Sequence, residues 1–338
     1  MAGVAKRQLL TFPKPKIGKS KSHSMAARSS VSYACARPFR VRRRRSITLS
    51  ASVPHDMPPL FDAGVPLESL PWGKDGVGKD VKSRRFQYKA EDGTTDLDGY
   101  FAWDPDVLPN SSQGLPGVLV AHTAIGPQEV FIHSCVDALA RLGFAAFALD
   151  VFGSIDKKCV FDQAQRDALF GPLRLDRTKH ARRVEAAYKI LVEQPEVGIT
   201  SDVFGIGFCL GGMAVLDLAR LQSAKRLAGI VSFHGSLDTP RIDSDETNDM
   251  KTACLLFHGT GDPFNPPEQV SACLAGLDES ELPYKIIEFQ NVKHGFTRPE
   301  KTTPEDYKAG FGYDQEAAAK SWAMTKTFLE KGGSLDAV

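Results

Sequence analysis

The residues with the clearest chemical character lie around Cys209, where an apolar run ends in a cysteine enclosed by glycines. Val203–Phe208 has the composition of a buried strand, and a helical pattern follows from Met213. Gly207 and Gly211 favour a sharp strand-to-helix turn, because a close backbone approach leaves no room for a Cβ atom. Such a turn places the thiol at a helix N-terminus, where free N–H groups and the helix dipole favour a thiolate. The sequence therefore predicts Cys209 as a nucleophile.

An acid and a histidine follow Cys209 along the chain. Asp262 comes just past the apolar run Ala253–Phe257, and His294 follows the predicted strand Tyr284–Phe289. In a catalytic triad the base lies next to the nucleophile and the acid orients the base. We therefore expect Cys209 as nucleophile, His294 as base and Asp262 as the acid that orients it.

Other acids and histidines could take these roles. Asp238 and Asp243, in the loop after the predicted strand ending at Phe233, are the alternative acids. His234 and His258 lie at predicted strand ends, where we expect them to form local hydrogen bonds.

Four motifs in this order resemble the dienelactone hydrolase family, and the resemblance extends from about residue 81 to about residue 331. It implies an α/β-hydrolase fold, in which the nucleophile lies on a strand–turn–helix elbow and the order is nucleophile, acid, histidine. It also implies hydrolysis of a lactone or ester through an acyl-cysteine. The motifs are Gly-Phe-Cys-Leu-Gly-Gly at 207–212, Ser-Phe-His-Gly at 232–235, His-Gly-Thr-Gly-Asp-Pro at 258–263 and His-Gly-Phe-Thr-Arg-Pro at 294–299.

The oxyanion hole of such an enzyme is made of backbone N–H groups. One donor is the residue after the nucleophile, here Leu210, and the other comes from the loop after the predicted strand Gly117–Ala121, where we expect Ala124. His122 ends the same strand and is predicted near the substrate.

Family members carry a glutamate in this loop that helps to control the proton of the thiol, and this sequence has Thr123 at that position. Threonine does not accept a proton at neutral pH. Glu129, a few residues on, is a weaker substitute. The hypothesis is that Cys209 is instead held as a thiolate–imidazolium pair with His294.

The family also holds a substrate carboxylate with two arginines. Arg298 matches one of them, and Ser154 stands where the other would fall, with Lys157 and Lys158 close by. The resemblance thus implies a small, possibly anionic substrate bound by Arg298, with Thr123 and His122 beside it.

Strands and helices alternate along the rest of the domain, which predicts a mostly parallel, doubly wound α/β sheet flanked by helices. Ligands bind such sheets at the carboxyl ends of the strands, where the three triad candidates fall. Residues 156–176 are expected to form a lid. The predicted strands are 84–89, 98–103, 117–121, 144–149, 203–208, 227–233, 253–257 and 284–289, and the predicted helices are 128–142, 178–193, 213–221, 266–274 and 314–331.

The first 52 residues differ in composition from the rest of the chain. They contain 13 of the 42 lysines and arginines, none of the 41 aspartates and glutamates, and many serines. This pattern predicts an organelle transit peptide for the plastid stroma or, alternatively, the mitochondrion. A basic tail that binds anionic surfaces is the other interpretation. Residues 53–80 are predicted as a linker or N-terminal arm, and residues 81–335 as an α/β-hydrolase domain.

The remaining features narrow the classes of function. The domain is acidic once residues 1–52 are set aside, which disfavours nucleic-acid binding, and no apolar run is long enough to span a membrane. The six cysteines form no C-x-x-C pair, and we expect no metal and no cofactor. The expected partner is a small ester or lactone, and the expected state is a monomer or homodimer. The alternatives are a general carboxylesterase or thioesterase, a ligand-binding protein on the same scaffold, and a redox-sensing thiol protein.

Overall fold

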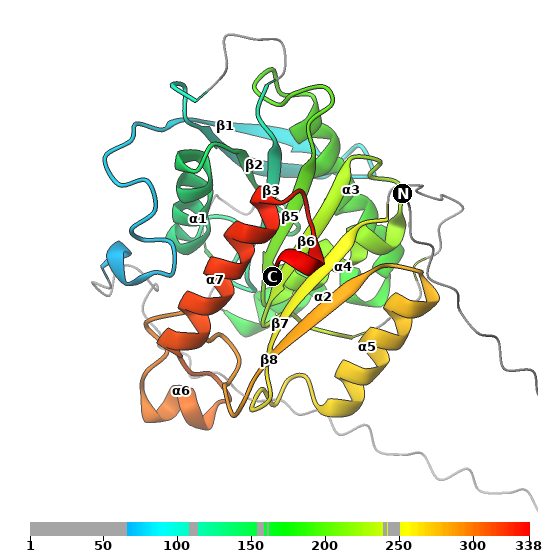
Figure 1. Cartoon of the computed structure of the whole chain (residues 1–338). Coiled ribbons are helices and arrows are strands. Elements are labelled where there is room, and N and C mark those ends of the chain that lie inside the picture. Colours follow the sequence, from blue (N-terminus) through cyan, green and yellow to red (C-terminus); the bar gives the residue numbers. More distant parts are fainter. Residues whose placement is uncertain (1–65, 108–113, 154–158, 161, 239–241, 243–250) are drawn as a thin grey trace, which may run out of the picture. The chain divides into compact units, whose positions relative to one another are not determined.

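A mostly parallel sheet forms the centre of the folded chain (Figure 1). The computed structural model describes residues 66–107, 114–153, 159–160, 162–238, 242 and 251–338. Within these residues the strand order is β1-β2-β4-β3-β5-β6-β7-β8. β2 pairs antiparallel with β1 and β4, and every other pair is parallel. The strands are β1 (Lys82–Lys89), β2 (Asp96–Trp103), β3 (Gly117–Ala121), β4 (Ala145–Leu149), β5 (Val203–Phe208), β6 (Leu227–Phe233), β7 (Ala253–Gly259) and β8 (Tyr284–Phe289).

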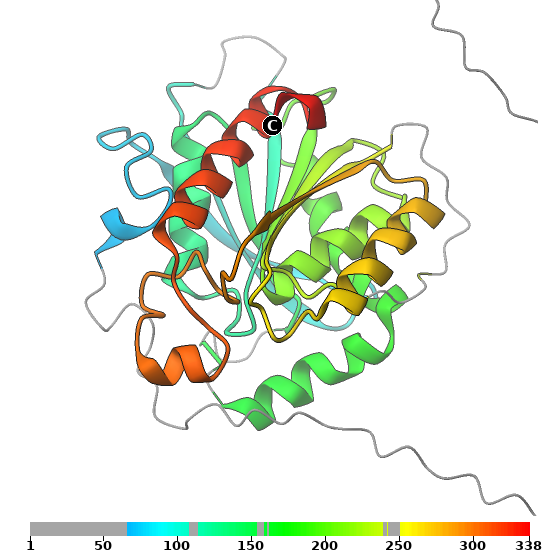
Figure 2. The ribbon, with the colours of Figure 1, turned by 60° about the horizontal axis from the view of Figure 1, so that its bottom comes forward.

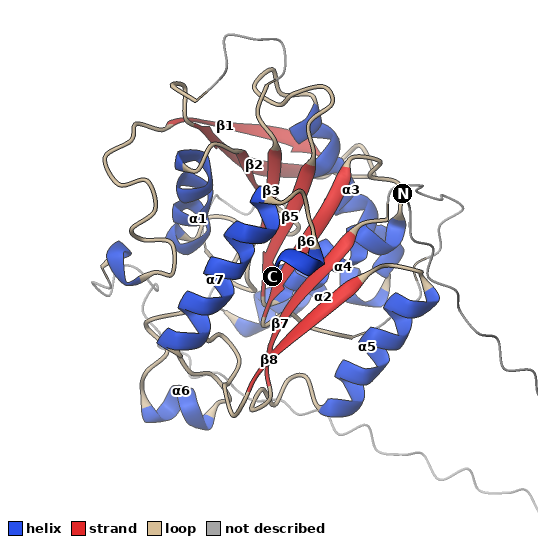
Figure 3. Ribbon diagram, in the orientation of Figure 1, coloured by secondary structure: helices blue, strands red, loops and turns tan. Residues whose placement is uncertain are grey.

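Helices cover both faces of the sheet (Figure 3), so the predicted doubly wound α/β architecture is confirmed. α3, α4 and α5 pack on one face, and α1 and α7 pack on the other. No helix in the described ranges is long and apolar enough to cross a membrane. The helices are α1 (Val130–Arg141), α2 (Gln163–Leu175), α3 (Arg177–Val192), α4 (Leu210–Leu221), α5 (Pro267–Glu279), α6 (Pro304–Lys308) and α7 (Gln315–Glu330), with 3-10 turns η1 (Leu67–Ser69) and η2 (Leu335–Ala337).

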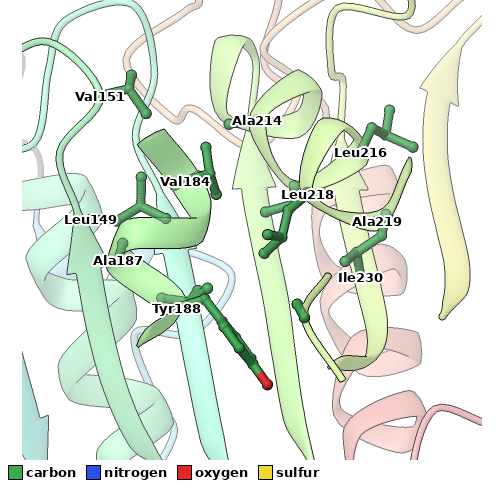
Figure 4. Packing of buried hydrophobic residues seen from close by; sticks show 14 of the residues in the cluster. Leu149, Val151, Val184, Ala187, Tyr188, Ala214, Leu216, Leu218, Ala219 and Ile230 are labelled. Carbon is green, nitrogen blue, oxygen red and sulfur yellow. The ribbon is translucent and has the colours of Figure 1, made fainter. Parts of the chain in front are cut away.

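The central strands are apolar on both faces, as strands between two helix layers must be. In β5, Phe204, Ile206 and Phe208 point to the α1/α7 layer. Gly205 points to the opposite layer, where an added Cβ would lie 3.1 Å from Val215 of α4. Figure 4 shows the α3/α4 side of this core, in which Val184 packs with its aliphatic neighbours. The absence of side chains at Gly205 and Gly207 thus lets α4 approach the end of the strand that carries Cys209.

Two differences from the predicted elements concern the site. The helix after Cys209 begins at Leu210 rather than at Met213, so the cysteine is the N-cap residue itself. The predicted lid, 156–176, contains α2, which the sequence did not indicate because Gly171 and Pro172 interrupt its helical pattern. Leu173 is its only buried residue. α2 begins where Asp162 accepts a hydrogen bond from Gln165 N and includes Pro172 near its end. The part of the lid at 154–158 and 161 lies outside the described residues.

The predicted linker or arm is described from residue 66 onward, and this part packs on the α1/α7 layer. Trp72 is buried against Phe131, Phe208 and Trp322. Asp75 accepts hydrogen bonds from Trp322 Nε1 at 2.5 Å and Lys326 Nζ at 2.8 Å. The predicted transit peptide, 1–52, lies outside the described residues.

Candidate active site

Cys209 occupies the sharp turn between β5 and α4, in a backbone conformation that non-glycine residues rarely adopt. Its φ is 55° and its ψ is −116°. The turn is held by close packing, since a Cβ on Gly207 would lie 2.0 Å from the Gly211 carbonyl oxygen. A Cβ on Gly211 would lie 2.2 Å from the carbonyl oxygen of Ala121. The glycines around the cysteine are therefore required by geometry, and the turn presents the thiol at the N-terminus of α4.

Three groups converge on the Cys209 sulfur. The backbone N–H groups of Leu210 and Ala124 are hydrogen-bonded to it, and so is the His294 ring. Burial by itself raises the pKa of the thiol. The charge on His294 and these hydrogen bonds outweigh burial, and the pKa lies below the ordinary value for cysteine. The two N–H groups expected to form an oxyanion hole thus lie where an anion at Cys209 is stabilised.

His294 and Asp262 form the second half of this arrangement. His294 Nδ1 and Asp262 Oδ2 are 2.8 Å apart, and both side chains are buried. Asp262 Oδ1 accepts a hydrogen bond from Phe264 N at 2.8 Å. Asn265 Nδ2 also donates to Asp262 Oδ2, at 2.9 Å, and to the Gly235 carbonyl at 3.0 Å. The acid is therefore fixed by three donors, of which the sequence-based prediction anticipated only the histidine.

The charges of this group favour an ion pair between Cys209 and His294. Burial by itself lowers the pKa of His294, but the charges of Cys209 and Asp262 outweigh it and raise the pKa to about 10. Burial raises the pKa of Asp262, and the adjacent His294 brings it below its usual value. At neutral pH the histidine is thus protonated and the aspartate is ionised, and the charge of the imidazolium favours the thiolate form of Cys209.

A pH profile of alkylation tests this pairing. Because the thiolate is the reactive form, we expect iodoacetamide to alkylate Cys209 at a nearly constant rate from about pH 9 down to well below about 8.5, the midpoint of an ordinary cysteine. The rate should fall only when the pH passes the lowered pKa of the thiol. The modified Cys209 peptide can be quantified by mass spectrometry. In His294→Gln the midpoint should return towards about 8.5; a wild-type midpoint already at that value would contradict the pairing.

Aromatic side chains surround the His294 ring. Phe264 and Phe311 meet it edge-on, with ring centroids at 5.1 and 5.5 Å. His234 packs against it at 5.1 Å and forms a hydrogen bond with Thr297 Oγ1 at 2.8 Å. Burial and the charge on His294 hold the pKa of His234 well below its usual value, so its ring is neutral. His234 is thus a packing neighbour of the candidate base.

Asp238, the alternative acid, lies elsewhere. It accepts a hydrogen bond from Arg177 Nη1 at 3.0 Å and is 3.5 Å from Arg174 Nε. Asp243, the other alternative, lies outside the described residues, as do Ser154, Lys157 and Lys158. Among the residues that the structure places, no group of three or more histidine, cysteine or acidic side chains is arranged to hold a metal ion.

His122 does not have the position expected of a substrate-binding residue. Its ring is fully buried, with Nδ1 2.6 Å from the Thr123 carbonyl oxygen and Nε2 3.2 Å from Val151 N. Burial lowers the pKa of His122 to about 4, so the ring is neutral and donates from Nδ1. Both ring nitrogens are used by the backbone, and His122 is not retained as a substrate ligand.

Thr123 and Arg298 also differ from expectation, because both are bound to Glu129. Thr123 Oγ1 is 2.5 Å from Glu129 Oε2, and Arg298 Nη2 is 2.8 Å from Glu129 Oε1. Arg298 Nε contacts Glu300 Oε1 at 2.5 Å. A guanidinium buried between two carboxylates is already more than neutralised, and a third carboxylate would add charge repulsion in a region with little water. Arg298 and Thr123 are therefore not retained as substrate ligands either.

The structure instead brings Arg166 towards the nucleophile. Arg166 lies on α2, the green helix along the lower edge of Figure 2, and donates to the Val160 carbonyl at 3.2 Å and to Gln163 Oε1 at 2.7 Å. Burial lowers the pKa of Arg166, and the charges of Asp167, Asp162 and Cys209 act in the opposite direction. The guanidinium is thus close enough to Cys209 to interact with its charge. The predicted lid, 156–176, included Arg166, but the sequence indicated neither the helix nor a role for this arginine.

Comparison with known proteins identifies the family and agrees with the fold. The model of the dienelactone hydrolase family matches residues 105–332. A dienelactone hydrolase-like promiscuous phosphotriesterase, P91, from metagenomic libraries is 33% identical, with a TM-score of 0.63 over 74% of this chain and 98% of that protein. The solved structure called m3DLH is 28% identical, with a TM-score of 0.65 over 75% of this chain and 99% of its own.

A dienelactone hydrolase described as putative, from Klebsiella pneumoniae, is 17% identical with a TM-score of 0.56, which supports the fold. Among curated proteins, an uncharacterized protein of Caenorhabditis elegans is 30% identical over 151 residues, which are 44% of this chain and 91% of that protein. The fold shared with these structures is the α/β-hydrolase fold that the resemblance implied.

Proposed function

The chain belongs to the dienelactone hydrolase family, and from this premise we propose that it hydrolyses small esters or lactones through Cys209, His294 and Asp262. The observation that carries the proposal is the position of the Cys209 sulfur, which is hydrogen-bonded to His294 and to two backbone N–H groups. A binding protein on the same scaffold would not require this arrangement. Turnover by a general carboxylesterase or thioesterase would use the same residues on another substrate.

In the proposed reaction, the Cys209 thiolate attacks the carbonyl carbon and forms a C–S bond. The carbonyl electron pair moves to the oxygen, where the N–H groups of Leu210 and Ala124 stabilise the negative charge. When the intermediate collapses, the C–O bond to the leaving group breaks and the His294 imidazolium donates its proton to the departing oxygen. An acyl-cysteine and a neutral histidine remain.

Water completes the proposed cycle. His294 takes a proton from the water as its oxygen adds to the thioester carbonyl, and collapse of this second intermediate breaks the C–S bond and releases the thiolate. The carboxylic acid product then ionises to solvent. Asp262 stays ionised throughout and stabilises the imidazolium each time it forms.

The direct test is to follow turnover by the full chain of a dienelactone, p-nitrophenyl acetate and a short acyl thioester, while intact mass spectrometry detects acyl-enzyme. Hydrolysis of the lactone together with an acyl adduct would support the proposal in full. Turnover of only the ester or thioester would keep the mechanism and change the substrate class. No turnover and no adduct with any of them would favour the binding-protein alternative.

A second candidate activity is slow hydrolysis of phosphotriesters. The observation that favours it is the 33% identity to a protein described as a promiscuous phosphotriesterase. Attack by Cys209 on phosphorus would expel the aryl oxide and leave a dialkyl phosphoryl group on sulfur. A mass increase on Cys209 after incubation with a p-nitrophenyl phosphotriester would support this activity, and unchanged mass with no release of nitrophenol would exclude it.

We propose Arg166, rather than Arg298, as the cation that favours an anionic substrate. A hydrogen bond to a charged group contributes about 1.5–3 kcal/mol, so Arg166→Gln should raise KM for p-nitrophenyl hydrogen succinate by about tenfold or more. KM for the neutral p-nitrophenyl butyrate should change little. Arg174→Gln, on the same helix but beside Asp238, is the matched control. An equal change for both esters would mean that Arg166 does not recognise charge.

A further inference from the structure

Thr123, Glu129 and Arg298 form a continuous buried chain between two loops of the site. Thr123 lies in the loop that also provides the Ala124 N–H group, and Arg298 lies four residues after His294. Glu129 joins them, with one carboxylate oxygen 2.5 Å from Thr123 Oγ1 and the other 2.8 Å from Arg298 Nη2. All three side chains are buried. The chain therefore connects the loop of the second N–H donor to the loop of the base.

Glu129 lies at the start of α1, where a side chain often caps the helix. It is the N-cap residue of α1, yet its side chain makes no capping hydrogen bond. A side-chain cap typically contributes about 1 kcal/mol to the stability of a helix. This carboxylate instead turns inward, and both of its oxygens are hydrogen-bonded. The Glu129 side chain thus binds Thr123 and Arg298 and does not cap α1.

Both the side chain and the backbone of Arg298 make contacts that hold it in place. Its Nε contacts Glu300 Oε1 at 2.5 Å, and its guanidinium carbon lies 4.6 Å from the centre of the Phe131 ring. Its backbone N–H donates to the Gly295 carbonyl oxygen at 3.0 Å, which closes the turn directly after His294. Arg298 therefore connects Glu129 to the hydrogen-bonded turn that follows His294.

Thr123 connects Glu129 to the loop after β3, which contains the Ala124 N–H group. Its hydroxyl donates to Glu129 and accepts from Ile125 N at 3.1 Å, so the hydroxyl orientation is fixed. Gly126 N donates to the Thr123 carbonyl at 3.2 Å. The Ala124 N–H group, which points at Cys209, is the backbone donor between these two bonds. Rotation of the loop would break one of them before the Ala124 N–H could turn away.

We infer that Thr123, Glu129 and Arg298 are positioning residues that aim the Ala124 N–H at the developing oxyanion. The inference rests on the proposed function. In this arrangement, Thr123 and its partners hold the loop in place where the family has a glutamate beside the thiol, and His294 is the main group that lowers the pKa of Cys209. The contacts among Thr123, Glu129 and Arg298 should then matter much more for chemistry at a carbonyl group than for ionisation of the thiol, to which the Ala124 N–H contributes less than His294 does.

Two reactions of the same sulfur separate these effects. Acylation by p-nitrophenyl acetate places negative charge on a carbonyl oxygen and requires the oxyanion hole. Alkylation by iodoacetamide forms a C–S bond as iodide leaves, and no charge develops on a carbonyl oxygen. A variant that misaligns the Ala124 N–H should therefore slow the first reaction far more than the second, because Ala124 makes the smallest of the contributions that stabilise the thiolate.

The test compares full-length Thr123→Val with Thr123→Ser. Valine has nearly the shape of threonine but makes neither hydroxyl hydrogen bond, whereas serine retains the hydroxyl. Loss of one oxyanion donor typically lowers the rate about a hundredfold or more, so Thr123→Val should lower kcat/KM for p-nitrophenyl acetate by about that factor. Its iodoacetamide rate, measured at a pH at which the thiol is ionised, should stay within about twofold of wild type, and its pH midpoint should stay well below that of His294→Gln. Thr123→Ser should retain most of the activity.

Glu129→Gln is the second variant, used also if Thr123→Val does not fold, and should show the same separation. Ester turnover within about threefold of wild type in both variants would overturn the inference. An equal loss of acylation and alkylation would overturn it as well, because the group would then act on the thiolate. An effect confined to KM of anionic esters would instead make Arg298 a substrate ligand. Absence of Cys209-dependent turnover in the wild type would refute the proposed function itself, and the inference with it.

Discussion

Cys209→Ala is expected to lower kcat/KM for any ester or lactone that the protein hydrolyses by more than about 10⁴-fold. The variant loses the atom that forms the covalent bond, which the strained turn at residue 209 presents at the N-terminus of α4. Intact mass spectrometry should detect no acyl adduct at any time point. The measurement is initial-rate kinetics of both proteins with p-nitrophenyl acetate and a dienelactone, beside mass analysis of quenched samples.

Cys159→Ala is the matched control for this variant. Cys159 is the other cysteine in the described residues that is not fully buried, and it lies close in sequence to α2. We expect its replacement to leave turnover and the acyl adduct unchanged. If Cys209→Ala retained more than a few per cent of the activity while Cys159→Ala lost it, the nucleophile would be assigned to the wrong cysteine.

The parts of the site that could be predicted from the sequence are those determined by backbone geometry. Glycines on both sides of Cys209 required a close turn, and the apolar runs before Asp262 and His294 required strand ends at one edge of a parallel sheet. The contact of 2.8 Å between His294 and Asp262 follows from that placement. The directions of side chains in the loops do not follow from it.

His122 and Arg298 illustrate this limit. Both lie next to strand ends or motif residues, as predicted, but His122 faces Val151 and Arg298 faces Glu129. Their direction depends on partners distant in sequence, and Glu129 and Arg298 are 169 residues apart. Arg166 was not predicted because the helix that carries it was not predicted. It lies on α2, inside the predicted lid, where Gly171 and Pro172 obscured the helix in the sequence.

Asp262→Asn is expected to lower kcat by about 10⁴-fold, the order found when the acid of a serine-protease triad becomes an amide. Asp262 Oδ2 accepts from His294 Nδ1 and Asn265 Nδ2, and Oδ1 accepts from the backbone N–H of Phe264. An asparagine has one N–H₂ group in place of an acceptor, so in either orientation at least one donor faces another donor. The imidazolium also loses the negative charge that raises its pKa.

The pH midpoint of Cys209 alkylation distinguishes this effect from a loss of folding. Because a less basic His294 no longer stabilises the thiolate, the midpoint in Asp262→Asn should rise towards that of an ordinary cysteine, at about 8.5. Asp238→Asn is the matched control, since Asp238 is the alternative acid and contacts Arg177 instead of His294. We expect it to retain both the activity and the low midpoint. If Asp238→Asn lost activity and Asp262→Asn kept it, the acid that orients His294 during turnover would be Asp238, and the loop after β6 would have to move to bring it there.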